Sequence, residues 1–321
     1  MIVVFGSVAV DLVVNVPHIP RPGESLQAPC YTPVAGSKGG NQALAAARSG
    51  ARVVHVASVG RDGYAEAATA ALRAEGVDLS HIALSDKATG ICLVAVAADG
   101  ENTVIAAAGA NLDTSVSQLE AVAFGSGDTL VLQMEVPLQD NVAAVRLAKA
   151  RGARVILNVA PAGPVDGATL SALHFLIVNE HEAMVVAKAL GLAATEPEEA
   201  ARAIHDRCGC STIVTLGPRG AVAYHRGSAV PVAAPEVAVL DTTGAGDSFT
   251  GAFAAALDAG EDLTTALRRA VAGGSLACTV HGAQTSIPRL DAILAAMRHP
   301  DQPAIDDVGS TIGATTSSRG D

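Results

Sequence analysis

A glycine-rich turn that ends in an aspartate stands late in the chain, at Asp241-Thr-Thr-Gly-Ala-Gly-Asp247, directly before an apolar helical stretch. Small residues at a helix start leave backbone N–H groups free to face an anion, and the positive end of the helix dipole points to the same place. Asp247 would stand beside this anion hole, where its carboxylate can accept a proton. Phosphoryl transfer needs both features. An aspartate in a first helical turn is also ordinary capping, so this segment alone leaves both readings open.

A second glycine-rich turn, within Gly36–Gly50, also stands directly before a helical stretch. It carries Lys38 and Asn41, whose polar groups can bind hydroxyls, although a tight turn before an Ala-rich helix is the simpler reading. The chain has no G-x-x-x-x-G-K-[ST] pattern, and Gly6 stands alone after the first predicted strand. Neither a P-loop NTPase nor a typical dinucleotide enzyme is therefore indicated.

Composition narrows the class of protein further. The chain has 321 residues, half of them hydrophobic, which is enough for one large α/β domain. The net charge is −11 and the basic residues do not cluster, so we expect no nucleic-acid or membrane partner. Five scattered cysteines predict reduced thiols. The N-terminus lacks signal-peptide features and no apolar run approaches the ~20 residues of a membrane span, so a cytoplasmic protein is predicted.

Short β-branched runs alternate with Ala-rich helical stretches, which is typical of a mostly parallel sheet wrapped by helices. The predicted strands are Ile2–Phe5, Val53–Val56, Thr129–Leu132, Val155–Leu157, Phe175–Val178 and Thr212–Thr215. The predicted helices are Gly39–Ser49, Tyr64–Ala74, Gln139–Ala150, Glu180–Leu190, Glu198–Asp206, Gly244–Asp258, Leu263–Val280 and Arg289–Met297. One domain, 1–298, is expected, followed by a disordered polar tail at 299–321.

Two regions in the first third break this alternation. Extra strands are predicted at 11–16 with 26–34 and at 90–97 with 103–108. They could form a small β-layer that covers one edge of the sheet as a lid. A pair of hairpins without a function fits the pattern equally well.

Together, the two glycine segments resemble the ribokinase, or PfkB, family of carbohydrate kinases, and the similarity extends in order from about Val3 to Pro288. One family signature resembles Gly36–Gly50 continuing through Val59–Gly63, and the other resembles Asp241–Gly251. Two long signatures in the right order are more specific than either glycine cluster. The resemblance implies a ribokinase-like Rossmann-type α/β sandwich with a β-sheet lid and a homodimer formed through that lid. It also implies ATP-dependent phosphorylation of a primary hydroxyl of a small sugar. Because ribokinase is the nearest family member, the expected reaction converts D-ribose to D-ribose 5-phosphate.

The same resemblance implies roles for individual residues. Asp247 would be the catalytic base, with the anion hole at Gly244, Ala245 and Gly246. Sugar hydroxyls would contact Asp11, Gly36, Lys38, Asn41, Glu135 and Asp247. ATP would lie against Asn179, Thr215, Gly217, Gly220, Gly246, Val271 and Ser275. Mg²⁺ would be held through water by Glu182, and a K⁺ ion by Asp241, Thr243, Ala277, Val280, Gly282 and Ser286.

Two positions depart from the family pattern. Ala9 stands where ribokinases commonly have an asparagine, and Ser37 replaces the second glycine of a Gly-Gly-Lys turn. A lost polar partner can change discrimination strongly, so another pentose, a deoxy or ketose sugar, or a nucleoside stays open as substrate. A sugar-binding regulator without turnover is the alternative from another class, although it would not need Asp247 and the anion-hole glycines.

Overall fold

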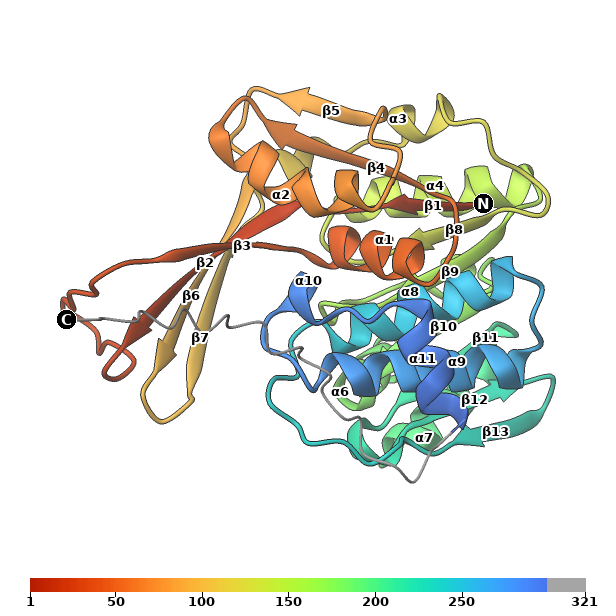
Figure 1. Ribbon diagram of the computed structural model, residues 1–321. Helices are drawn as coiled ribbons and strands as arrows, with labels where there is room; N and C mark the ends of the chain where they lie inside the picture. The colour runs from red at the N-terminus through yellow and green to blue at the C-terminus, as the bar shows by residue number, and fades with distance from the viewer. Residues whose placement is uncertain (299–321) are drawn as a thin grey trace, which may run out of the picture.

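The protein is described by a computed structural model over residues 1–298 (Figure 1), so the tail predicted at 299–321 lies outside the described residues. The main sheet has nine strands in the order β13-β12-β11-β10-β9-β8-β1-β4-β5. All neighbours pair in parallel except β11–β12 and β12–β13. The predicted α/β class with a mostly parallel sheet is confirmed. The strands are β1 Ile2–Phe5, β4 Val53–Gly60, β5 Ile82–Ser85, β8 Thr129–Leu132, β9 Arg154–Asn158, β10 Phe175–Asn179, β11 Ser211–Thr215, β12 Ala221–His225 and β13 Ser228–Val232.

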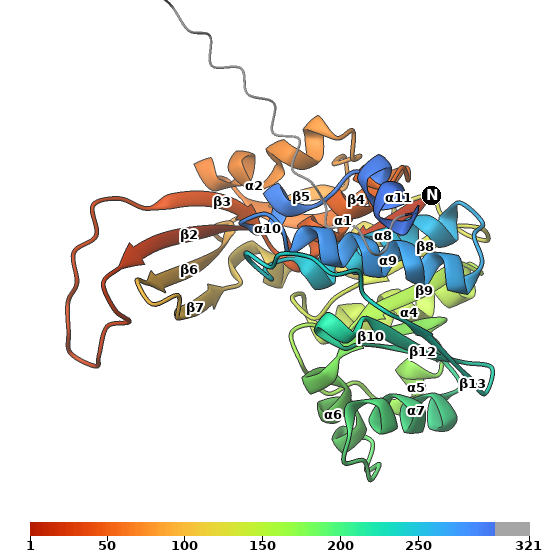
Figure 2. The ribbon, with the colours of Figure 1, turned by 60° about the horizontal axis from the view of Figure 1, so that its bottom comes forward.

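Helices cover both faces of this sheet (Figure 2). Because successive strand residues point to opposite faces, Ile2 and Val4 pack into one core layer while Val3 and Phe5 pack into the other. The first layer lies under α1 Lys38–Arg48, α2 Gly63–Ala74, α8 Ala245–Asp258 and α9 Leu263–Ala277, with α10 Ala283–Ser286 and α11 Leu290–Arg298 beside them. The second lies under α3 Val116–Glu120, α4 Leu138–Ala150, α5 Gly167–Leu170, α6 Glu180–Ala189 and α7 Pro197–Cys208. Two 3₁₀ turns complete the fold, η1 Gly109–Asp113 and η2 Gly217–Arg219.

A second sheet, which we call the lid sheet, projects from one side of the molecule (Figure 1, Figure 2). Its four strands run in the order β3-β2-β6-β7, with β2 and β6 parallel and the outer pairs antiparallel. They are β2 Ala9–Val16, β3 Thr32–Gly36, β6 Gly90–Ala97 and β7 Asn102–Ala107. The strand expected at 26–34 begins only at Thr32, because Pro29 has no N–H to give to a ladder. Pro33 is tolerated since β3 is an edge strand.

Three strands of the main sheet were not predicted from the sequence. β5 has only four residues and no strong β-branched run. β12 and β13 form a hairpin in which His225 pairs with Ser228. Its turn places Arg226 and Gly227 at φ 50° and 76°, the conformation in which Asn-Gly is the usual signal. Because an arginine occupies the first of these positions, the sequence does not carry the usual signal for this turn.

Two further properties concern the molecule as a whole. Over residues 1–298, none of the helices combines the length and the apolar character that crossing a membrane requires. All five cysteines are free thiols. Cys208 and Cys210 are buried and Cys30 is exposed.

Candidate active site

A cavity of about 190 Å³ opens where the carboxyl ends of β9, β10 and β11 meet the first turns of α6 and α8. Ligands of parallel α/β sheets bind at this edge, because the loops that leave the strands converge there. The cavity brings together residues far apart in sequence. Its lining is Lys38, Asn158, Ala160, Ile177, Val178, Asn179, Glu182, Thr215, Thr242, Gly244, Gly246 and Asp247.

The N-terminus of α8 faces this cavity without a side-chain cap. Gly244 has a φ of 77°, and a Cβ built on it would lie 3.1 Å from Cα of Ala283, so a side chain would be strained and crowded there. No described residue accepts a hydrogen bond from the backbone N–H of Gly246 or Asp247. Ala245, directly before these two residues, donates its own N–H to Thr242 O at 3.2 Å. Free N–H groups and the positive helix end together favour an anion.

The carboxylate of Asp247 is buried, and both its oxygens accept hydrogen bonds. Asn41 Nδ2 donates to Oδ2 at 2.9 Å and Gln42 Nε2 donates to Oδ1 at 2.9 Å. Burial raises the pKa of Asp247 to about 6, while Lys38 and the two amides act in the opposite direction. A carboxylate that titrates near neutral pH is suited to proton transfer.

Gln42 was missed as a functional residue by the sequence reasoning. It is fully buried, and its Nε2 also donates to Asn158 Oδ1 at 3.1 Å. The side-chain carbonyl oxygens of Gln42 and Asn41 have no hydrogen-bond partner among the described residues. The only signal in the sequence was its place directly after Asn41 in the glycine-rich segment.

Lys38 and Glu135 meet at the start of α1. Oε2 of Glu135 accepts hydrogen bonds from the Lys38 backbone N–H at 2.9 Å and from Ser7 Oγ at 2.6 Å. Burial alone would lower the pKa of the Lys38 ammonium, but the charges of Asp247 and Glu135 raise it above its ordinary value. Lys38 is therefore a cation held inside a largely acidic pocket. Ser7 is a further polar group that the sequence did not single out.

Asp11 lies on β2 of the lid sheet, in register with Val34 on β3 and Cys92 on β6. Burial raises the pKa of its carboxyl. A Cβ at Gly36 would lie 2.5 Å from Asp11 Oδ2, so only glycine lets β3 approach this carboxylate. Cys92 was missed by the sequence reasoning; burial and the charge of Asp11 raise the pKa of its thiol to about 12, so it stays a neutral donor.

Asn179 and Glu182 form a capping box at the start of α6. Asn179 Oδ1 accepts from the Glu182 N–H, and Glu182 Oε2 accepts from the Asn179 N–H, both at 2.8 Å. The capping role is therefore real, and both residues also line the cavity. Burial raises the pKa of Glu182 although the Asn179 N–H lowers it.

The residues expected to bind the nucleotide divide between two places. Thr215 lines the first cavity at the end of β11. Gly217, with φ 54°, opens onto free space, whereas a Cβ on Gly220 would lie 2.1 Å from Val232 O, so Gly220 allows close packing. Val271 lines a second cavity of about 660 Å³ between α9, α11 and the segment 231–236. Ser275 lies one turn further along α9 and is half-buried.

The residues expected to hold a monovalent cation lie on two loops that Asp241 joins. Its Oδ1 accepts from Thr243 N at 2.9 Å and Thr243 Oγ1 at 2.6 Å, and its Oδ2 accepts from Gly282 N at 2.8 Å. Burial would raise the pKa of Asp241, but these hydrogen bonds lower it. Ser286 Oγ donates to Ala283 O at 2.8 Å.

This set of groups fits a hard cation, because it offers only oxygen. No described residue donates a hydrogen bond to the carbonyl oxygens of Thr243 or Val280. Ala277 ends α9 and is buried next to this loop. Over residues 1–298, no group of three or more His, Cys, Asp or Glu side chains is placed to hold a metal ion. For Mg²⁺ this leaves Glu182 as a lone carboxylate, which suits an ion that keeps most of its waters.

Comparison with known proteins identifies a family, related sequences and similar solved structures. Residues 1–290 match the pfkB family of carbohydrate kinases. The chain is 35% identical over 303 residues to a ribokinase of Haemophilus influenzae, covering 92% of this chain and 98% of that protein. It is 31% identical over 294 residues to a deoxyribokinase of Salmonella typhi, covering 90% and 96%. A solved structure of Arabidopsis thaliana ribokinase complexed with ribose and ATP superposes with a TM-score of 0.82 at 29% identity, covering 92% of this chain and 98% of that one.

The chain therefore belongs to the pfkB family of carbohydrate kinases. Within this family it is ribokinase-like in both sequence and fold. The predicted family and the predicted enzyme class, an ATP-dependent carbohydrate kinase, are confirmed.

Proposed function

We propose that this kinase transfers the γ-phosphoryl group of ATP to the primary hydroxyl of D-ribose, giving D-ribose 5-phosphate. The observation that carries the proposal is the juxtaposition of buried Asp247 with the free N–H groups of Gly246 and Asp247 at the start of α8. One carboxylate and one anion-binding helix end thus meet in a single cavity. The similarity to ribokinases supports ribose as the acceptor.

In this proposal Asp247 removes the proton from the attacking hydroxyl. The backbone of Gly244, Ala245 and Gly246 surrounds the developing charge on the phosphoryl group, and the ammonium of Lys38 adds positive charge on the same side. Asp11, Gly36, Asn41 and Glu135 hold the remaining sugar hydroxyls, together with Lys38. The unpartnered Oδ1 of Asn41 leaves an acceptor free for such a hydroxyl.

The nucleotide would place its phosphates near Asn179, Thr215 and Gly217, and its base toward the second cavity. The positions assigned to it are Asn179, Thr215, Gly217, Gly220, Gly246, Val271 and Ser275. Glu182 would hold Mg²⁺ through water, and the ion would supply positive charge against the phosphate groups. K⁺ would lie beside the anion hole between the loops of Asp241 and Gly282.

A 2-deoxypentose is the second candidate acceptor. Ala9 lies two residues before Asp11 on the same face of β2, is 5% exposed, and pairs with Gly36 and Gly90. This point of the pocket therefore offers no polar side chain to a hydroxyl. A site that forms no bond there loses little when that hydroxyl is absent.

The test is ADP release with MgATP and KCl over D-ribose, 2-deoxy-D-ribose, D-fructose and inosine. We expect the highest kcat/KM with D-ribose or 2-deoxy-D-ribose and none with Asp247→Ala. Asp113→Ala serves as a matched control, because within residues 1–298 this carboxylate binds Ser85 and Lys87 and does not line the cavity. Turnover on inosine alone, or normal turnover by Asp247→Ala, would overturn the proposal.

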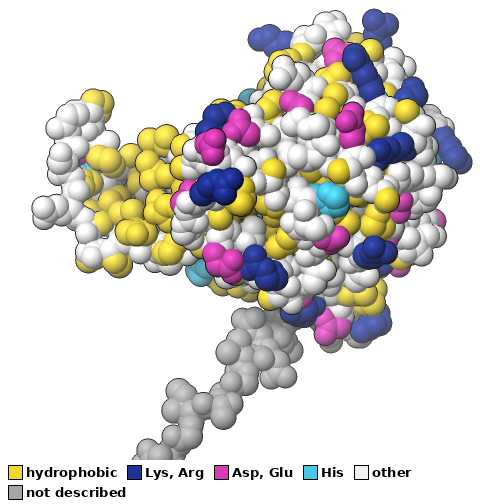
Figure 3. Space-filling view, turned by 90° about the horizontal axis from the view of Figure 1, so that it is seen from above, with side chains coloured by type: hydrophobic (Ala, Val, Ile, Leu, Met, Phe, Trp, Pro, Cys, Tyr) yellow, Lys and Arg dark blue, Asp and Glu magenta, His cyan; other side chains and the backbone are white. Residues whose placement is uncertain are grey.

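The assembly and location belong to the same proposal. Figure 3 shows hydrophobic side chains gathered on the projecting lid sheet. Tyr31, Leu93, Val104 and Ile105, on this sheet or directly before it, are between 47% and 62% exposed. Exposed apolar side chains that gather on one element mark interaction surfaces. We propose that two copies pair through their lid sheets, and that the enzyme works in the cytoplasm with its thiols reduced.

A further inference from the structure

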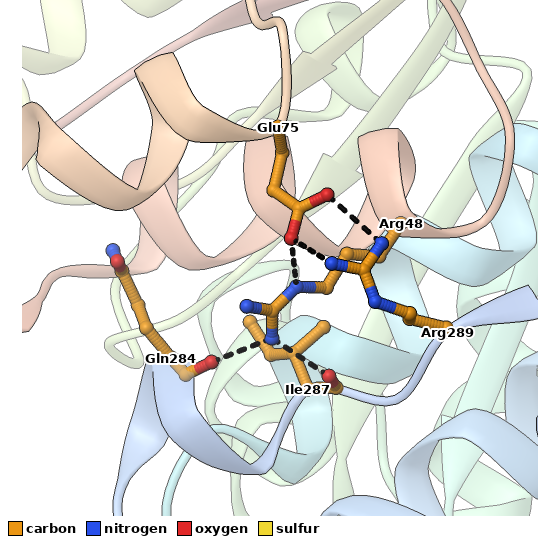
Figure 4. Close-up of polar contacts among 5 residues, drawn as sticks. All are labelled: Arg48, Glu75, Gln284, Ile287 and Arg289. Carbon is orange, nitrogen blue, oxygen red and sulfur yellow. Dashed lines mark hydrogen bonds and ion pairs between the residues drawn. The ribbon is translucent and has the colours of Figure 1, made fainter.

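Three charged side chains meet where α1, α2 and the segment before α11 come together (Figure 4). Arg48, the last residue of α1, donates from Nε to Glu75 Oε1 at 3.1 Å. Arg289 donates to both oxygens of the same carboxylate, at 2.6 and 3.0 Å. Burial would raise the pKa of Glu75, but the two guanidinium groups lower it below its ordinary value. Glu75 is thus ionised and binds both arginines.

Arg48 uses a second guanidinium nitrogen, Nη1, to bind the backbone of the α10 turn. Its Nη1 donates to Gln284 O at 2.9 Å and to Ile287 O at 2.8 Å, as Figure 4 shows. These two carbonyls flank Ser286, one of the residues proposed to hold K⁺. The guanidinium is therefore held by Glu75 through Nε, and it binds two carbonyls of the turn through Nη1.

The α10 turn depends on contacts with its surroundings to stay in place. It has four helical residues and no side-chain cap at its N-terminus, and one turn of helix is not stable alone. Both polar atoms of the buried Gln284 side chain lack partners among the described residues. Yet the turn carries Gly282, which binds Asp241, and Ala283, which packs on Gly244 of the anion hole.

We propose that Arg48, held by Glu75, is a positioning residue for the monovalent-cation site. It sets the place of the Gly282–Ser286 turn relative to Asp241 and the start of α8. This inference rests on the proposed K⁺ site. Because α1 begins at Lys38 and ends at Arg48, one rigid helix would then connect the sugar contacts with the cation loop.

Lysine cannot replace Arg48 in this role. The planar guanidinium spreads its N–H groups in fixed directions and reaches a carboxylate and two carbonyls at once, whereas an ammonium is a point charge. The arginine is only 18% and Glu75 only 16% exposed, so water does not readily substitute for the lost bonds. Loss of a group that orients metal ligands typically weakens metal affinity by about 10–100-fold.

The test compares Arg48→Met and Arg48→Lys with the wild type and with Arg73→Met. Arg73 pairs with Glu66 on the exposed face of α2 and does not touch the turn, so it is the matched control. Two quantities are measured over a KCl series, with choline chloride keeping ionic strength constant. They are kcat with the preferred sugar, and the thermal midpoint of the protein without sugar or ATP. Arg289→Met, which removes a partner of Glu75 but not the grip on the turn, gives a milder second variant.

We expect the half-activating KCl concentration to rise about 10-fold or more in both Arg48 variants. The KCl-dependent rise in thermal midpoint should move to higher concentration in parallel, and saturating KCl should restore most of kcat. Arg73→Met should behave as the wild type. An unchanged half-activating concentration in folded Arg48→Lys or Arg48→Met would overturn this inference alone. A wild-type enzyme that turns over equally without K⁺ would overturn the cation site and this inference together, while leaving the kinase assignment intact.

Discussion

The burial of Asp247 sets opposing demands on one side chain. Burial favours the neutral acid, and the bonds from Asn41 and Gln42 favour the ion, so its pKa comes to about 6 instead of 3.8. A base needs to be ionised at the working pH yet basic enough to take a proton, and a value near neutrality satisfies both. The same burial makes the ionised residue a source of instability in the folded protein.

Asp247→Asn should abolish turnover and stabilise the fold at pH 8. A folded-state pKa raised from 3.8 to about 6 means that ionisation at pH 8 costs the folded state about 3 kcal/mol. This cost grows as pH rises from about 4 to 6, so the advantage of the variant should shrink as pH falls toward 4. Urea unfolding at pH 8 and at pH 5 measures the difference. A variant less stable than the wild type at pH 8, with the gap closing toward low pH, would show that the pKa is not raised.

Gln42→Leu should move the acid limb of the pH profile of kcat upward. The wild type is expected to lose activity as pH falls through about 6, because Asp247 becomes protonated. Removing one amide donor worth about 1 kcal/mol should raise the apparent pKa by about 1 unit. Gln42→Glu, which adds a like charge, should raise it further. An unshifted limb in both variants would mean that Gln42 only fills space.

The residues of this site were predictable to different degrees. Asp247, Lys38 and Asn41 could be predicted from the sequence because their types stand out beside glycine turns at helix starts. Gln42, Ser7 and Cys92 were not found, because each gains its role from a partner on another element; Gln42 meets a carboxylate 205 positions away. Such contacts follow from tertiary packing and leave no local pattern.

At the scale of elements, Ser37 holds a strained backbone conformation at the start of α1. It has φ 78° and ψ 145°, a region that almost only glycine adopts, at a cost of about 1–3 kcal/mol. Its Oγ offsets part of this cost by donating to Ser7 O at 3.0 Å and accepting weakly from the Gly40 N–H at 3.4 Å. The residue thus keeps the backbone shape of the glycine that the family pattern has there.

Ser37→Gly should accordingly be more stable than Ser37→Ala by about 1–3 kcal/mol. Both variants lose the hydroxyl, but only glycine releases the strain. Thermal or urea unfolding of the two proteins gives the difference directly. Equal stabilities would show that the turn relaxes without cost when the hydroxyl is gone. Ser49→Ala at the end of the same helix tests whether losing a serine hydroxyl matters by itself.

The elements were predicted best where several signals agree. β1 and β8 are short buried runs rich in β-branched residues, and the helical stretches on either side of them indicated a parallel sheet. The β12–β13 hairpin was missed because Arg226 occupies a turn position that normally carries Asn or Gly. The pairing of β2 with β6 joins segments about eighty residues apart, so no local pattern could give its register.

At the scale of the whole molecule, the exposed lid sheet predicts the state of assembly. Val104 and Ile105 are 56% and 62% exposed and point to opposite faces of β7. Changing both to Asp should convert a dimer into a monomer whichever face is used. Leu138→Asp is the control, since this 43% exposed residue lies on α4, away from the lid sheet. Sedimentation or light scattering decides; an unchanged dimer in the double variant would exclude the lid sheet as the interface.

The way the lid sheet is attached limits how it can move. β2 follows β1 after only Gly6, Ser7 and Val8, and β3 runs into α1 with only Ser37 between them. These two junctions are tied to each other by the bond from Ser37 Oγ to Ser7 O, and to Glu135 through Ser7 Oγ and the Lys38 N–H. These hydrogen bonds join the lid sheet to the place where we propose that the sugar binds. A sugar that contacts Glu135 would shift both junctions together, and in the proposed dimer this movement would reach the second subunit.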